Sequence, residues 1–205
     1  MISIFSLGCI IGYFITYIIN WFVKKEEQNE YLLTGKICIG LLTGVLFSIN
    51  YLINGFKDLT LYTSVLIILF ELIAFIDLRC LIIPDMFNIL IMGFSLILIF
   101  GFDVNLWIDS VDIIGVIIFN SLLLIIVIIV YKIRKIEILG FGDIKLLFGI
   151  GMLFGLTNFS YALVVASLAA LFVEVIILKK KRDIIPYGPY LTFGFLLIWF
   201  FQLNY

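Results

Sequence analysis

The chain has 205 residues, of which 64% are hydrophobic and only 13% are charged, and its formal net charge is −1. This composition excludes a soluble globular protein, because too few polar side chains are present to cover its surface. The lack of histidine excludes histidine catalysis, and the three cysteines form no C-x-x-C pair that would indicate a zinc site. We therefore expect an integral membrane protein with no metal site. The net charge says nothing about nucleic acid, and we expect the lipid bilayer and no nucleic acid among its partners.

The apolar runs predict an all-α, polytopic helical bundle in the lipid bilayer. A membrane-spanning helix needs about 20 mainly apolar residues, and about eight segments approach this length. In chain order they are residues 2–23, 33–55, 59–80, 86–102, 112–131, 144–157, 158–178 and 189–204. We expect the short segment 144–157 to be tilted, re-entrant or merged with its neighbour. The connections are brief, so we expect a single domain over residues 1–205.

The basic residues predict the orientation of this bundle. If the N-terminus lies outside, every one of the 13 lysines and arginines except Lys57 falls on the cytoplasmic side, including the run at 179–182. An excess of basic residues in cytoplasmic loops is the usual rule for membrane proteins. The first segment has no basic region before it, so we expect a retained helix and not a cleaved signal peptide.

Two aspartates, Asp77 and Asp143, lie at predicted cytoplasmic ends of membrane segments. Asp77 is close to the C-terminal end of its helix, where the helix dipole disfavours a negative charge. Arg79 is two residues away and so does not share its face of the helix. Charged residues in such places are candidates for function. A purely structural interpretation of Asp143, as the N-cap of segment 144–157, stays open.

A pair of aspartates is nearly the only hydrolytic machinery that this sequence offers. Two carboxyl groups a few Å apart share one proton and titrate as a unit. The ionised member can take a proton from water while the protonated member polarises a carbonyl, which is acid–base hydrolysis of a peptide bond. Gly140 and Gly142, beside Asp143, would let an extended substrate backbone approach.

Three stretches carry recognisable motifs in a fixed order. Residues 140–147 read GFGDIKLL, Asp77 is followed by six residues and then Pro84-Asp85, and residues 185–190 read IPYGPY. These stretches resemble the GxGDxKLL, D-x6-P-D and IPFGP motifs of the type IV prepilin leader peptidases, which are GxGD membrane aspartyl proteases. The ordered motifs cover most of the C-terminal two thirds of the chain.

The resemblance implies an activity and a set of site residues. It implies that Asp77 and Asp143 are the catalytic pair, and that the chain cleaves the short basic leader of prepilins or pseudopilins at the cytoplasmic face of the inner membrane. It implies no cofactor. We expect a supporting or substrate-binding role for Gly140, Gly142, Lys145, Pro84 and Asp85. Lys145 also fits simple anchoring at the lipid headgroups. From its own position, Asp85 also fits ordinary helix-start chemistry, because an acid after proline is common there.

One departure from the family concerns the first cytoplasmic loop. Many members carry a domain there, with paired C-x-x-C zinc motifs, and also methylate the new N-terminus with S-adenosylmethionine. Here residues 24–33 read KKEEQNEYLL and contain no cysteine. The chain therefore resembles a short form that lacks the zinc and methyltransferase domain, and we expect a peptidase without the usual methyltransferase activity.

Two other functions stay open from the sequence. The chain could be a GxGD protease with another substrate, of the archaellin-precursor or intramembrane type, or an ion-coupled transporter that uses Asp77 and Asp143 as ligands. Two further acids lie within segments. We expect Glu71 to make an interhelical hydrogen bond or line a cavity, and Glu174 to pair with Lys179.

Overall fold

The structure, a computed structural model, describes residues 1–26, 31–101, 110–135, 139–177 and 185–202. Within these ranges it consists of helices joined by short connections, and no strand occurs there. The elements are α1 (Ile2–Lys25), α2 (Leu33–Asn54), α3 (Asp58–Cys80), α4 (Asp85–Gly101), α5 (Ser110–Arg134), α6 (Phe141–Leu171), the π-helix η1 (Phe172–Ile177) and α7 (Gly188–Gln202).

Helix length and side-chain exposure identify a membrane protein. Among the described residues, α1, α2, α3, α5 and the continuous stretch α6–η1 are long and apolar enough to cross a bilayer, and α4 and α7 are shorter apolar helices. Large aliphatic side chains cover the outer face of α5, among them Ile114, Ile118, Leu122 and Ile125. Such a surface is unfavourable in water and is the expected one toward lipid. The all-α polytopic bundle is thus confirmed.

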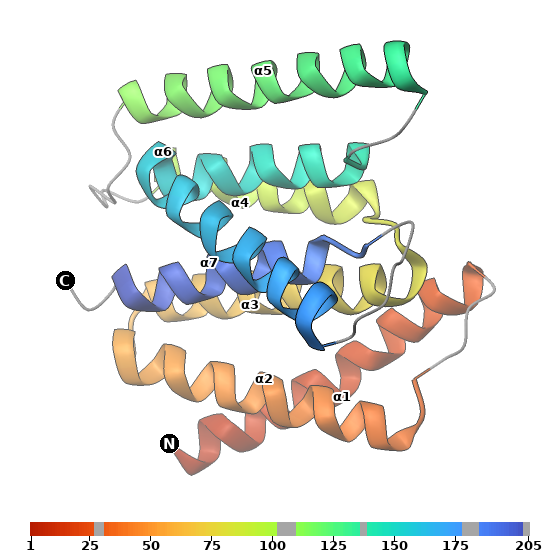
Figure 1. Cartoon of the computed structure of the whole chain (residues 1–205). Coiled ribbons are helices and arrows are strands. Elements are labelled where there is room, and N and C mark those ends of the chain that lie inside the picture. The colour runs from red at the N-terminus through yellow and green to blue at the C-terminus, as the bar shows by residue number, and fades with distance from the viewer. Residues whose placement is uncertain (27–30, 102–109, 136–138, 178–184, 203–205) are drawn as a thin grey trace.

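The predicted segments 144–157 and 158–178 are merged, which is one of the alternatives expected for the first of them, and the boundary between them moves. They form one continuous element, in which Gly155 alone has a non-helical backbone with φ 70° and ψ 165°. The chain reverses direction at this residue, so that the second arm of α6 diverges from the first and runs diagonally back toward the side where the first arm begins (Figure 1). Glycine adopts a positive φ without strain, so this one residue makes the turn, two residues before the predicted end of segment 144–157.

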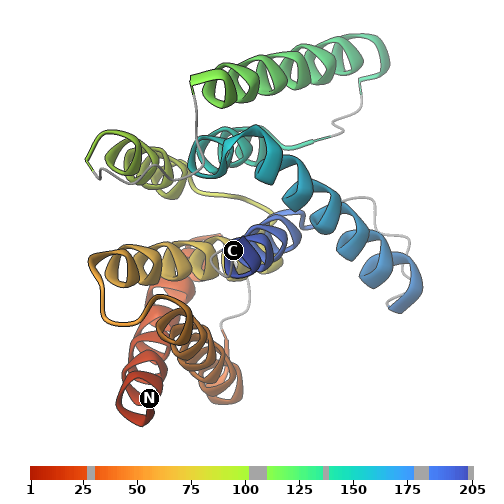
Figure 2. The ribbon, with the colours of Figure 1, turned by 90° about the vertical axis from the view of Figure 1, so that its left-hand side faces the viewer.

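Helices α1 and α2 pack closely through glycine. A Cβ added at Gly8 would lie 2.8 Å from Cα of Gly44, and one added at Gly40 would lie 2.9 Å from the carbonyl oxygen of Cys9. Small residues spaced by four allow two helix backbones to touch in a membrane, where dispersion contacts drive association. The two helices form a pair beside α3, on the side of the bundle opposite α5 (Figure 2).

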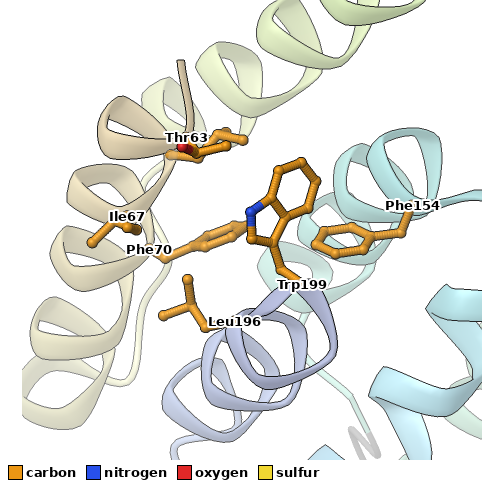
Figure 3. Close-up of a pocket in the computed structure, with 7 residues that line it drawn as sticks. Thr63, Ile67, Phe70, Phe154, Leu196 and Trp199 are labelled. Atoms are coloured by element: carbon orange, nitrogen blue, oxygen red, sulfur yellow. The ribbon is translucent and has the colours of Figure 1, made fainter. Parts of the chain in front are cut away.

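The centre of the bundle lies between α3, the first arm of α6, and α7. Trp199 of α7 stands between Phe70 of α3 and Phe154 of α6, with Thr63 of α3 close by (Figure 3). The rings of Phe154 and Trp199 meet edge to face, with centroids 5.3 Å apart. Aromatic packing of this kind fixes the lateral spacing of the three helices that carry the site described below.

Four helix ends meet at one end of the bundle. In Figure 1, α3 ends on the right-hand side, and α4, α6 and α7 begin there. Helices α1 and α5 also end on this side, and their last turns carry Lys24, Lys25, Lys132 and Arg134. Most of the basic residues that the structure describes therefore gather at the same end as Asp77 and Asp143, whereas Lys57 precedes the opposite end of α3. The basic run at 179–182 lies outside the described residues.

Candidate active site

Asp77 lies in the last turn of α3 and is almost fully buried, with 4% of its surface exposed. Its carboxylate oxygen Oδ2 accepts a hydrogen bond of 2.8 Å from the backbone N–H of Gly188. Leu81 follows the last residue of α3 and caps the helix in the left-handed conformation, with φ 56°. Its N–H donates to the carbonyl oxygen of Asp77. A non-glycine residue in this conformation is uncommon and turns the chain sharply toward α4.

Gly188 is the first residue of α7, and the amide groups of this helix start are all accounted for. The N–H groups of Tyr190 and Leu191 bond to the carbonyl oxygen of Tyr187, and Pro189 has no N–H. The N–H of Gly188 is the donor that remains, and Asp77 accepts it. Helix N-termini favour anions. The C-terminal end of α3 thus disfavours the negative charge of Asp77, and the N-terminal end of α7 favours it. Spacing along the sequence does not reveal this contact.

Asp143 comes from the first turn of α6, but it is not the N-cap. Gly140 is the N-cap, so Asp143 is the third residue of the helix, and the structural interpretation as a cap is wrong. Its carboxylate turns back toward the helix start and contacts the backbone of Gly140. A Cβ added at Gly140 would lie 3.1 Å from Oδ2. The other oxygen, Oδ1, is buried and accepts no hydrogen bond from any described residue.

Asp77 and Asp143 come together in space, 66 positions apart in the sequence. The two carboxyl groups are close enough for a direct electrostatic interaction. They come from α3 and from α6, whose ends meet at the same end of the bundle. Two carboxyl groups that interact in this way can titrate as a coupled pair, and such a pair can serve acid–base hydrolysis.

The connection between α3 and α4 packs directly on the glycine before Asp143. A Cβ added at Gly142 would lie 3.1 Å from Cβ of Ile83 and 3.4 Å from its carbonyl oxygen. Asn88 of α4 donates from Nδ2 to the carbonyl oxygen of Gly142 at 3.4 Å, and its own Oδ1 is buried without a partner among the described residues. Sequence reasoning missed Asn88. Its position three residues after Asp85, at the start of α4, was the available signal.

Asp85 and Lys145 lie at the surface of the site and bind each other. Lys145 Nζ is 2.7 Å from Asp85 Oδ1, and the two side chains are 50% and 65% exposed. Asp85 begins α4 directly after Pro84, as helix-start chemistry predicts. The pair joins the first turn of α4 to that of α6. Neither residue contacts Asp77 or Asp143 through a hydrogen bond or ion pair that the structure shows.

Tyr31 attaches the start of α2 to the end of α3. Its hydroxyl donates to the carbonyl oxygen of Phe75 at 3.1 Å, and its N–H donates to Oδ1 of Asn20 at 2.9 Å. The guanidinium group of Arg79 lies over its ring, 4.5 Å from the centroid. Burial raises the pKa of the Tyr31 hydroxyl above its usual value, so it stays a neutral donor. Arg79 is thus stacked on an aromatic ring beside the site.

The two acids inside the membrane segments have polar partners. Thr43 of α2 donates to Oε2 of Glu71 at 2.7 Å, which confirms the expected interhelical hydrogen bond. Glu174 accepts a hydrogen bond of 2.9 Å from the hydroxyl of Tyr190. The expected pairing of Glu174 with Lys179 concerns a residue outside the described ranges. Within the described part of the chain, no group of three acidic, cysteine or histidine side chains is arranged to hold a metal ion.

Comparison with known proteins gives the family. The model of the type IV leader peptidase family matches residues 64–175, which is more than half of the chain and includes both Asp77 and Asp143. The curated proteins and the solved structures gave no match. With this match over the segment that brings the two carboxyl groups together, the chain belongs to the type IV leader peptidase family and is a membrane protease of the aspartyl type.

Proposed function

We propose that the protein is a prepilin-type endopeptidase in which Asp77 and Asp143 form the catalytic pair. The observation that carries this proposal is the meeting of these two carboxyl groups, from α3 and α6, at the basic end of the bundle. One of them is bound by the N–H of Gly188, and the other has a buried oxygen with no partner among the described residues.

The proposed mechanism needs only these two groups and a water molecule. The ionised carboxylate removes a proton from water as the water attacks the scissile carbonyl carbon, and the protonated carboxyl donates a hydrogen bond to the carbonyl oxygen. The proton then passes to the leaving amine, and the pair returns to its singly protonated state. Oδ1 of Asp143, which accepts nothing from the described residues, is available to the attacking water.

The proposed substrate is a prepilin or pseudopilin, whose basic leader lies on the cytoplasmic side and whose apolar helix lies in the bilayer. The basic helix ends beside the site support this orientation of the enzyme in the inner membrane. Gly142, Pro84 and the Asp85–Lys145 pair shape the site and do not take part in the chemistry. The proposal extends over residues 1–205 as one catalytic domain that acts on the substrate in the bilayer.

Cleavage of a designed substrate in proteoliposomes tests this function. The substrate has a short lysine-containing leader, a glycine and an apolar helix, and mass spectrometry locates the cut. We expect cleavage directly after the glycine, and loss of cleavage when the leader lysines are replaced by glutamine. Cleavage inside the apolar helix, or equal cleavage of both leaders, would instead support a GxGD protease with an intramembrane or other substrate.

The same assay tests the proposed lack of methyl transfer. With S-adenosylmethionine added, we expect the mass of the cleaved product to match an unmodified N-terminus. A product heavier by one methyl group would show that the short first loop does not remove this activity.

A further inference from the structure

The start of α7 is held against the second arm of α6 by two tyrosine side chains on either side of Gly188. The hydroxyl of Tyr187 is 2.9 Å from Oγ of Ser167, and the hydroxyl of Tyr190 donates to Oε1 of Glu174 at 2.9 Å. Ser167 and Glu174 are seven positions apart, on α6 and on η1, and both side chains reach the segment at the start of α7. Two anchors on one helix therefore fix the backbone segment that carries Gly188.

Glu174 is the stronger of the two anchors, because it is buried within the protein. Its side chain is 3% exposed, whereas the contact of Ser167 lies at the surface. Its second oxygen, Oε2, has no partner among the described residues. A buried carboxyl group in a membrane segment is unfavourable unless it is bound, and the phenol of Tyr190 is the donor that the structure shows for it.

The helix is irregular where Glu174 occurs. Residues 172–177 form the π-helix η1, directly after the regular part of α6. A π-helical turn widens the helix and changes which side chains face a neighbour, and such turns are frequent at functional sites. Here the turn carries Glu174, the one buried residue within η1, toward α7.

These contacts lead to the carboxylate of Asp77 in two steps. Glu174 binds Tyr190, and Tyr190 is two residues from Gly188, whose N–H is 2.8 Å from Oδ2 of Asp77. The space between position 188 and Asp77 is small, because a Cβ added to Gly188 would also lie 2.8 Å from this oxygen. A shift of α7 by a fraction of an ångström would lengthen the bond to Asp77 or force a clash.

We propose that Glu174 is a positioning residue of the active site, which acts through Tyr190 to hold the N–H of Gly188 on Asp77. Glu174 does not touch the reacting atoms. Its acceptor oxygen, and not its negative charge, is what the contact uses. The expected effect of Glu174 on cleavage rests on the proposed function, whereas its effect on the hydrogen bond between Gly188 and Asp77 does not. The two parts can therefore be measured separately.

The sequence provides a direct probe of the hydrogen bond. Tyr187-Gly188 is the only Tyr-Gly pair in the chain, so labelling tyrosine carbonyls with ¹³C and glycine amides with ¹⁵N selects the Gly188 amide in an NMR spectrum. In the unmodified protein we expect this amide proton downfield, as for a donor to a carboxylate, and we expect it to move on Asp77→Asn. This measurement needs no substrate.

Four variants test the positioning, with the amide resonance and the cleavage kinetics read in parallel. Tyr190→Phe and Glu174→Leu should shift the Gly188 resonance upfield and lower kcat about tenfold with little change in KM, because the substrate contacts are intact. Glu174→Gln keeps an acceptor oxygen and should behave like the unmodified protein. Tyr161→Phe, at a tyrosine with 60% of its surface exposed on the same arm of α6, is the matched control and should change neither quantity.

The outcomes separate the two claims. An unchanged Gly188 resonance in both Tyr190→Phe and Glu174→Leu overturns the proposal. So does a Glu174→Gln variant as defective as Glu174→Leu, because the charge and not the acceptor would then matter. If the resonance shifts as expected but the unmodified protein cleaves no prepilin-like substrate, the positioning stands and the proposed substrate is wrong.

Discussion

Gly188 lies so close to Asp77 that no side chain fits between them. A Cβ at this position would be 2.8 Å from Oδ2 of Asp77 and 3.2 Å from its Cβ and Cγ. The same closeness gives the carboxylate its hydrogen bond from the N–H of Gly188. The glycine of the IPYGPY stretch is therefore part of the candidate active site, although 111 positions separate it from Asp77.

We expect Gly188→Ala to lower kcat by about 100-fold, because the added methyl group displaces the carboxylate or the start of α7 by a sizeable fraction of an ångström. The matched control is Gly93→Ala, since a Cβ at Gly93 in α4 would meet no atom within 4 Å. The control should retain full activity. Equal activity of the two variants in a cleavage assay would show that the contact at Asp77 has no role in catalysis.

Removal of the surface ion pair should have a small effect. Asp85→Asn and Lys145→Met each break a contact between side chains that are at least half exposed, and such pairs contribute about 0.2–1 kcal/mol. We expect cleavage to fall by less than about fivefold, and the double variant to resemble either single one. An inactive Asp85→Asn enzyme beside an active Asp77→Asn enzyme would mean that Asp85, and not Asp77, is the first catalytic carboxyl.

The hydrogen bond between Thr43 and Glu71 should matter for stability and not for catalysis. Thr43→Val removes the donor at 2.7 Å and leaves a buried carboxyl oxygen without it, which should lower the free energy of unfolding by about 1 kcal/mol. Thr34→Val, at an exposed threonine of the same helix, is the control. Unfolding in bicelles measures both. A stability loss no larger than that of the control would contradict the assignment.

The dependence of cleavage on pH should be bell-shaped. A pair that shares one proton is active when one carboxyl group is ionised and the other is protonated. The rate should therefore fall at low pH, where both are protonated, and also at high pH, where both are ionised. The profile of kcat/KM in proteoliposomes tests this expectation. A rate that rises to a plateau without a descending limb would indicate a single catalytic carboxylate.

The sequence was sufficient to predict the bundle and to single out the two aspartates as candidates. Long apolar runs predict membrane helices directly, because the bilayer fixes their length, and the end of α3 at Cys80 agrees with the predicted segment 59–80. Asp77 stood out because a helix C-terminus disfavours an anion. The structure shows what compensates for that position, the N-terminus of α7.

The remaining parts of the site depend on contacts between distant segments. No local pattern distinguishes Gly155, where the chain reverses, from the other glycines of α6, because its backbone angles follow from how the two arms pack. The contacts of Asn88 with Gly142 and of Glu174 with Tyr190 likewise join residues on different elements. Helical periodicity describes one helix at a time, so it cannot show which ends will meet.

The most direct test of the account is cleavage of a prepilin-like substrate in membranes by three single variants at comparable expression. We expect Asp77→Asn and Asp143→Asn to abolish cleavage, because each removes one member of the proton-sharing pair, whereas Asp85→Asn should remain active. If Asp77→Asn or Asp143→Asn still cleaved at the rate of the unmodified protein, the aspartyl pair proposed here would be wrong.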